Sequence, residues 1–157
     1  MKKSVYIETT VISYLAARPS RDLVVAANQQ LTREWWSEQS EKYSVFASQW
    51  VLQEAAAGDA SVAARRLELL SGCEILATPA TALQLAEAIL ASGAVPQKAS
   101  EDAFHLAVAT VNGMDYLLSW NCRHIVNANI QKRLARACAE VGYELPIICT
   151  PQALVGE

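Results

Sequence analysis

Short runs of β-branched and aromatic residues alternate along this chain with segments whose apolar residues recur at helical spacing. Runs of the first kind predict strands, and segments of the second kind predict helices. Strands are expected over residues 4–8, 43–47, 73–77, 116–119 and 147–149. Helices are expected over residues 11–17, 22–38, 49–57, 60–70, 79–91, 100–112 and 125–141. Because strands separated by helices pair in parallel, the pattern predicts an α/β fold: a three-layer α/β/α domain around a mainly parallel sheet of about five strands.

Residues with known preferences for helix ends support several of these boundaries. Thr9 and Thr10 are expected to cap the first helix, and Ser48 the third. Ser100 is expected to cap the helix over residues 100–112. Such side chains accept hydrogen bonds from the unpaired N–H groups of a first helical turn. Glycines follow four of the predicted helices, where a left-handed residue is often required; they are Gly58, Gly93, Gly113 and Gly142.

The composition is that of a folded protein with a buried interior. Hydrophobic residues make up 52% of the chain and charged residues 18%. That balance argues against disorder, and 157 residues suffice for one compact domain. No apolar run reaches the roughly 18 residues that span a bilayer, so no membrane segment is expected. The first residues lack the apolar stretch of a secretory signal, so the expected location is the cytoplasm.

The cysteines and the net charge exclude two kinds of site. No two of the four cysteines lie within ten residues of each other, so zinc-site spacing is missing and reduced, mostly buried thiols are expected. The net charge is −3, which argues against binding nucleic acid mainly through non-specific electrostatics. A polyanionic substrate would therefore need a local basic patch or bound metal ions.

Several common catalytic motifs are missing from the sequence. It contains neither Gly-x-Gly-x-x-Gly nor a P-loop, which argues against a dinucleotide enzyme and a P-loop nucleotide hydrolase. It also lacks the Gly-x-Ser-x-Gly elbow. His105 and His124 are the only histidines, which excludes a histidine-rich metal site. The remaining chemistry is that of carboxylates, the ligands that Mg²⁺ and Mn²⁺ prefer.

Three acids are the leading candidates for such a site. Glu8 ends the first predicted strand, Glu54 lies in a predicted helix, and Asp102 begins another. Each has a simpler interpretation. Glu8 and Glu54 could be solvated charges, and an acid at the position of Asp102 is stabilised by the helix dipole, typically by about 0.3–1 kcal/mol. In favour of a site, ligands of parallel sheets bind at the carboxyl ends of the strands, where Glu8 is expected.

Other polar residues follow these acids closely in the sequence. Asn121 comes just after the fourth predicted strand and is either a turn residue or a neutral ligand of a metal or its water. Glu101 is interpreted as a charge at a helix start. His105, one turn later, is interpreted as a packing or hydrogen-bonding residue rather than a metal ligand. Arg123 and the basic residues after it form either a rim that binds phosphates or a solvated surface.

Adjacent tryptophans are a further distinctive feature. Neighbouring residues on a helix point about 100° apart, so Trp35 and Trp36 cannot easily face one core. We expect Trp35 to be buried. Trp36 is a candidate for a protein–protein contact, where tryptophan is enriched.

Four segments of the sequence carry a resemblance to a known family. They are Tyr6-Ile7-Glu8-Thr9-Thr10, Val51-Leu52-Gln53-Glu54-Ala55 with Gly58-Asp59, Glu101-Asp102-Ala103-Phe104-His105-Leu106-Ala107, and Leu117-Leu118-Ser119-Trp120-Asn121 with Arg123-His124-Ile125. Together, in this order, they resemble the PIN-domain ribonucleases, and specifically the VapC-type toxins of bacterial toxin–antitoxin pairs. The resemblance covers nearly the whole chain and implies a single PIN-like domain over residues 1–157.

This resemblance implies a metal-dependent endoribonuclease. In the family, acids bind one or two Mg²⁺ or Mn²⁺ ions, which direct water onto an RNA phosphodiester. Glu8, Glu54 and Asp102 match the metal-binding acids, and Asn121 matches the fourth acidic position, so all four are expected to be catalytic. The implied partners are RNA, a small antitoxin protein that blocks the site, and a second copy of the chain in a homodimer.

Two departures from the family pattern bear on activity. Glu8 stands where the family usually has Asp, so a bound metal would sit farther from the backbone. Asn121 stands where an acid is common, which removes one negative charge and predicts weaker metal binding, with one ion instead of two.

Two other functions stay open. One is a PIN-like module that binds RNA or a partner without cutting. The other is a small α/β phosphatase, although the first strand is not followed by an Asp-x-Asp arrangement.

Overall fold

The computed structural model describes residues 1–155 and contains a five-stranded sheet in the order β3-β2-β1-β4-β5, with every neighbouring pair parallel. The strands are β1 (Lys3–Ile7), β2 (Tyr43–Ser48), β3 (Glu74–Leu76), β4 (Tyr116–Leu118) and β5 (Ile147–Cys149). The helices are α1 (Thr9–Ala16), α2 (Leu23–Glu38), α3 (Gln49–Ala55), α4 (Ala60–Leu70), α5 (Ala80–Ala91), α6 (Ser100–Val111) and α7 (Ala128–Glu140). The predicted α/β fold is confirmed.

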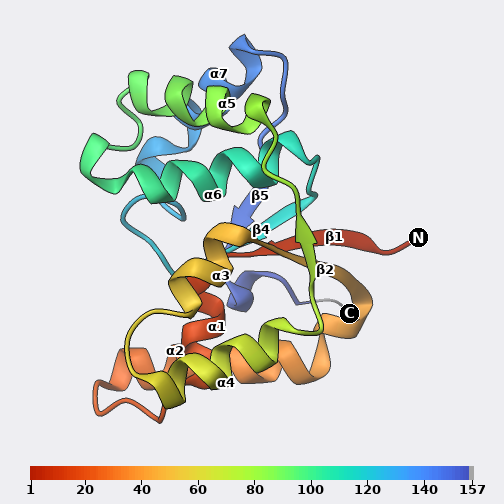
Figure 1. Ribbon diagram of the computed structural model, residues 1–157, viewed down its shortest axis with the longest axis vertical. Helices are drawn as coiled ribbons and strands as arrows, with labels where there is room; N and C mark the ends of the chain where they lie inside the picture. The colour runs from red at the N-terminus through yellow and green to blue at the C-terminus, as the bar shows by residue number, and fades with distance from the viewer. Residues whose placement is uncertain (156–157) are drawn as a thin grey trace.

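The helices form layers on the two sides of the sheet (Figure 1). On one side α5 packs on α6 and α7, and on the other α1 packs on α2 and α4. The central strand is buried from both sides, because Val5, Tyr6 and Ile7 have no exposed surface. A strand covered on both faces is expected to be apolar, as β1 is from Val5 to Ile7.

The strand order reverses beside β1. The chain runs from β1 outward through β2 to β3, and then returns to add β4 on the other side of β1. Ile7 and Leu118 are neighbours in the register of β1 and β4, and the Glu8 N–H donates to the Leu118 carbonyl at 3.0 Å. The residues that directly follow these two strands, Glu8 and Ser119, therefore meet at the edge of the sheet where ligands of such folds bind.

Most helix boundaries lie within two residues of those expected, but two predicted caps are wrong. Thr9 and Thr10 lie inside α1, whose N-cap is Glu8, and their hydroxyls donate to carboxylates instead of accepting from the first turn of α1. Ser100 is also helical, with φ −57° and ψ −30°, because a 3₁₀ turn over Gln97–Ala99 runs directly into α6. Ser48 does cap α3, accepting from the Val51 N–H.

The start of α7 also differs from the expectation. The helix begins at Ala128 rather than at residue 125, because residues 121–126 form a turn instead. The N–H groups of Ile125 and Val126 donate to the Asn121 carbonyl at 3.2 and 2.8 Å. Asn127 then caps α7 by accepting from the Asn129 N–H. The far end of α7 is as predicted, since Gly142 follows it with a φ of +85°.

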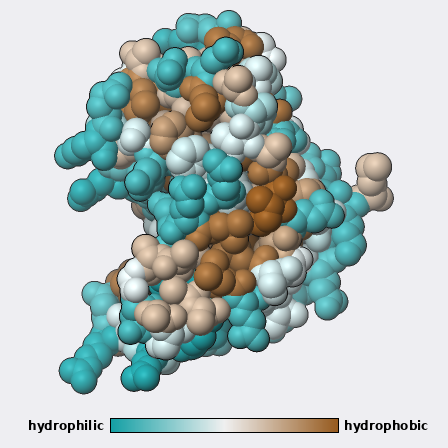
Figure 2. Space-filling view, viewed as in Figure 1, coloured by the Kyte–Doolittle hydropathy of each residue, from teal (hydrophilic) through white to brown (hydrophobic). Residues whose placement is uncertain are grey.

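The tryptophan pair divides between core and surface. Trp35 is buried, as expected, and Trp36 is half-buried. The four cysteines are free thiols, of which Cys122 is exposed. Figure 2 shows apolar atoms over the edge strand β3, where Ile75 is 45% exposed. No helix within residues 1–155 is long and apolar enough to cross a membrane.

Candidate metal centre

The fold gathers polar side chains from four separate segments beside the carboxyl ends of β1 and β4. Glu8 follows β1, and Glu54 lies on α3. Asp102 and His105 lie one turn apart on α6, so both occupy the same side of that helix. Asn121 comes three residues after β4. Every residue that the sequence pointed to is therefore near this edge of the sheet.

Glu8 is a buried carboxylate held by two hydroxyl groups. Only 4% of its surface is exposed. Thr10 Oγ1 and Ser119 Oγ each donate to Glu8 Oε1 at 2.6 Å. Burial raises the pKa of Glu8 above its usual value, although the charge of His105 and these hydrogen bonds partly oppose that effect. A negative charge buried in this way costs free energy unless a cation lies beside it.

Glu54 and His105 form an ion pair between α3 and α6. Glu54 Oε1 lies 2.5 Å from His105 Nε2 and accepts a hydrogen bond from Thr9 Oγ1 at 2.6 Å. Burial works against charge on Glu54, but the hydrogen bond and charge of His105 outweigh it and lower the pKa of Glu54. Burial likewise opposes charge on His105, yet Glu54, Glu8 and Asp102 raise the pKa of its imidazole.

The other ring nitrogen of His105 is fixed by a chain of hydroxyl groups. A hydrogen bond of 2.7 Å joins Nδ1 to Tyr6 Oη, and a second of 2.7 Å joins Tyr6 Oη to Ser48 Oγ. His105 is 1% exposed, and Tyr6 and Ser48 are fully buried. Burial raises the pKa of the Tyr6 phenol, so it stays protonated. The imidazole is thus held from both sides in a single orientation.

Asp102 and Asn121 form a second pair at the margin of the site. Burial raises the pKa of Asp102, while a hydrogen bond from the Asn121 side chain and the nearby histidines His105 and His124 favour its charged form. The side-chain oxygen of Asn121 accepts from the N–H groups of Arg123 and His124 at 3.2 and 3.0 Å. Asn121 is therefore a turn residue that also binds Asp102.

One group of side chains within residues 1–155 has the composition and spacing to hold a metal ion. It consists of Glu8, Glu54 and His105, whose ligand atoms all lie within 4.8 Å of one another. We call these three residues the donor cluster. Two of its members were predicted as metal ligands. The third predicted acid, Asp102, lies beside the donor cluster rather than within it.

Sequence reasoning missed two features of this site. His105 was interpreted as a packing or hydrogen-bonding residue; it does form hydrogen bonds, and it also belongs to the donor cluster. Its position three residues after Asp102 was the one available signal. The hydroxyls of Thr9, Thr10 and Ser119 carried no such signal, because threonine and serine are common at helix starts and in turns.

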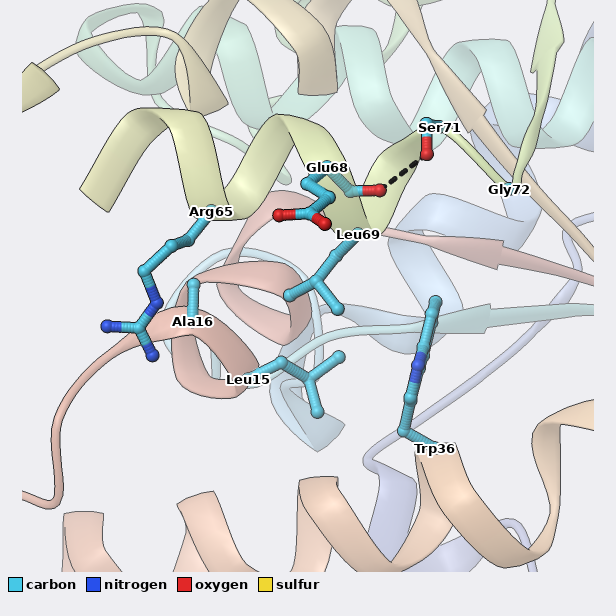
Figure 3. Close-up of a pocket in the computed structure, with 8 residues that line it drawn as sticks. All are labelled: Leu15, Ala16, Trp36, Arg65, Glu68, Leu69, Ser71 and Gly72. Carbon is cyan, nitrogen blue, oxygen red and sulfur yellow. Dashed lines mark hydrogen bonds between the residues drawn. The ribbon is translucent and has the colours of Figure 1, made fainter. Parts of the chain in front are cut away.

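Two hollows flank different parts of the molecule. A cavity of about 370 Å³ adjoins Glu54 and is also lined by Trp50, Gln53, Ala57 and Glu101. A groove of about 580 Å³ lies between α1, α2 and α4. Figure 3 shows Leu15, Leu69 and the ring of Trp36 bordering this groove, with Arg65 at one end. Of these two hollows, the cavity beside Glu54 is the one that a member of the donor cluster lines.

Comparison with protein-family models and with curated proteins finds no match for this chain. The fold and the geometry of the donor cluster are therefore the basis for a functional assignment.

Proposed function

We propose that this protein is a metal-dependent endoribonuclease that hydrolyses RNA phosphodiester bonds. The observation that carries the proposal is the donor cluster, in which two carboxylates and an imidazole converge within 4.8 Å where the strand order reverses. Two carboxylates and a nitrogen donor fit a divalent ion. The resemblance of the sequence to PIN-domain ribonucleases supplies the substrate, RNA.

As the family resemblance implies, Glu8, Glu54 and Asp102 would hold the ion, Mg²⁺ or Mn²⁺, with Asp102 approaching it from beside the donor cluster. Such an ion supplies stabilisation of the charge on a phosphodiester and a more acidic water. Thr10 and Ser119 keep the Glu8 carboxylate oriented, since both donate to the same oxygen. Asn121 orients Asp102 in the same way through its amide.

The chain must also receive a polyanion despite its net charge of −3. The cavity beside Glu54 is open to solvent and adjoins the donor cluster. Arg123, which is exposed and lies two residues after Asn121, would contact a phosphate. Attraction to RNA is then local, as expected of a protein whose overall charge would repel it.

The resemblance to VapC-type toxins further suggests a toxin regulated by a small antitoxin protein, and a homodimer. The half-buried Trp36 beside the groove of Figure 3 and the exposed Ile75 on edge strand β3 are apolar surfaces available for such contacts.

Cleavage of RNA by the purified protein tests the proposal directly. Wild type is assayed with Mg²⁺ and with Mn²⁺, and then compared with Glu8→Gln and Asp102→Asn. Each substitution keeps the size of the side chain and removes its charge. Glu140→Gln, at an exposed position at the end of α7, is the matched control. We expect both site variants to lose cleavage while the control keeps it. Equal cleavage by all four proteins, or cleavage in excess chelator, contradicts the proposal.

A second candidate is a PIN-like module that binds RNA or a partner without cutting it. The specific observation in its favour is Asn121, which stands at the fourth acidic position and uses its oxygen for the turn and its amide for Asp102. Calorimetric titration with Mn²⁺ distinguishes the two functions, since tight binding that depends on Glu8 speaks against the binding module.

A further inference from the structure

The imidazole nitrogen of His105 in the donor cluster affects which metal ions this site binds. His105 Nε2 is hydrogen-bonded to Glu54 Oε1. The ligand atoms of His105, Glu54 and Glu8 all lie within 4.8 Å of one another. Donors on opposite sides of one divalent ion lie about 4.2 Å apart, because each bond is about 2.1 Å long. The donor atoms, all within 4.8 Å of one another, are near this spacing, and His105 Nε2 and Glu54 Oε1, which are 2.5 Å apart, would separate to about 3 Å or more on binding one ion.

We propose that His105 is a direct metal ligand through Nε2, together with Glu8 and Glu54, and that the site therefore selects a first-row transition ion such as Co²⁺ or Zn²⁺ over Mg²⁺. This inference rests on the proposed function only in taking the donor cluster to be a metal site. It departs from the sequence-based expectation of an all-oxygen site for Mg²⁺ or Mn²⁺.

Each donor is oriented by a hydrogen bond from outside the donor cluster. Ser119 holds Glu8, Thr9 holds Glu54, and Tyr6 holds His105 at Nδ1. Metal-binding histidines almost always engage their second nitrogen in this way, which fixes the ring and strengthens the donor. The Tyr6 contact pairs a buried nitrogen and at the same time leaves Nε2 as the nitrogen that faces the two carboxylates.

Metal binding at the His105 imidazole requires the loss of one proton, from Nε2. In the ion pair, His105 Nε2–H donates to Glu54. A metal ion takes the place of that proton, which passes to solvent. With Nε2 bound to a metal, the remaining ring proton is on Nδ1 and donates to Tyr6 Oη, while Tyr6 Oη and Ser48 Oγ stay hydrogen-bonded to each other. The buried chain of hydroxyls therefore keeps both of its hydrogen bonds when the metal binds.

The donor set decides the preference among ions. Mg²⁺ prefers oxygen ligands and retains several waters, and it gains little from an imidazole. Imidazole favours ions such as Zn²⁺ and Fe²⁺, and affinities for first-row ions rise from Mn²⁺ through Co²⁺. We therefore expect affinity to increase in the order Mg²⁺, Mn²⁺, Co²⁺.

Nitrogen-15 NMR of the full-length chain tests ligation without any substitution. The sequence contains two histidines, so labelled His105 and His124 give two pairs of ring signals. On addition of Zn²⁺ we expect the His105 Nε2 signal to move to the metal-bound range, with Nδ1 still protonated and His124 unchanged. If calorimetry shows that Zn²⁺ binds but the His105 Nε2 resonance stays where it was, the inference is wrong and the proposed nuclease function stands.

Calorimetry with Mg²⁺, Mn²⁺ and Co²⁺ tests the selectivity. His105→Gln should reduce the affinity for Co²⁺ by about 10–100-fold and leave that for Mg²⁺ within about threefold. Glu140→Gln, at the exposed end of α7, is the control, and circular dichroism checks that each variant is folded. Tighter binding of Mg²⁺ than of Co²⁺ by the wild type overturns the inference alone. Absence of binding by all three ions overturns the inference and the metal-dependent function together.

Discussion

Replacing Tyr6 with phenylalanine removes one oxygen atom from the most buried part of the site. That atom is the midpoint of the chain from Ser48 to His105, with two hydrogen bonds of 2.7 Å. The ring itself stays, and so does the packing of β1 in the core. The substitution therefore isolates the contribution of the hydroxyl.

The size of the effect depends on the hydrogen bonds that Ser48 and His105 keep when the Tyr6 hydroxyl is removed. Ser48 Oγ still accepts from the Val51 N–H, so Ser48 loses only one of its hydrogen bonds. His105 Nδ1 has no other hydrogen-bond partner within residues 1–155, and His105 is 1% exposed, so water cannot replace the lost bond. Leaving one buried polar group unpaired costs about 1–3 kcal/mol. We expect Tyr6→Phe to lower the free energy of unfolding by about 2 kcal/mol, or the Tm by about 4–8 °C for a chain of this size.

Urea unfolding followed by circular dichroism measures this change, with chelator present throughout. The midpoint should fall while the slope of free energy against urea stays constant. Tyr43→Phe is the matched control. Tyr43 stacks on Trp35 and meets the edge of Tyr116, and its hydroxyl makes no hydrogen bond within residues 1–155. If Tyr6→Phe is as stable as this control to within about 0.5 kcal/mol, the reasoning about the buried chain fails.

Three further predictions test other parts of the molecule. Ser119→Ala leaves Thr10 as the hydroxyl donor to Glu8 and should weaken ion binding about tenfold by calorimetry, whereas the exposed Ser37→Ala should not. The backbone N–H and the hydroxyl of Ser4 donate to Asp115 and hold the pKa of its carboxyl below the usual value. Asp115 therefore adds stability above pH 3.8, and this stability is lost as the pH falls through the lowered pKa. Asp115→Asn should flatten that part of the acid unfolding curve. Gly113→Ala forces a side chain onto a φ of +68° and should cost about 1–2 kcal/mol in urea unfolding, while Gly72→Ala, with open space around it, should cost nothing.

The order of strands and helices was predictable because its signals are local. Apolar residues repeat every second position in a strand and every three to four in a helix, whatever the rest of the chain does. The position of Glu8 followed from that pattern, since it comes directly after an apolar strand. The failed caps at Thr9 and Thr10 show the limit of local rules. Their hydroxyls bond to Glu54 and Glu8, which the preference for helix caps does not take into account.

The role of His105 could not be read from its neighbours in the sequence. Its two partners, Tyr6 and Glu54, lie 99 and 51 residues away along the chain. No periodicity connects such positions, and only the packing of α6 against α3 and the sheet brings them together. Asn121 illustrates the same difficulty. Its turn was foreseeable from its type, but its hydrogen bond to Asp102 depends on where α6 ends up in the fold.

The hydrogen bond between Ser119 and Glu8 joins residues 111 positions apart. A chain still emerging from the ribosome contains Glu8 early, but it lacks the second hydroxyl that holds that carboxylate until three quarters of the protein has been made. Shorter fragments therefore lack this hydrogen bond, and the complete set of contacts to the Glu8 carboxylate forms only once β4 has been made and has paired with β1.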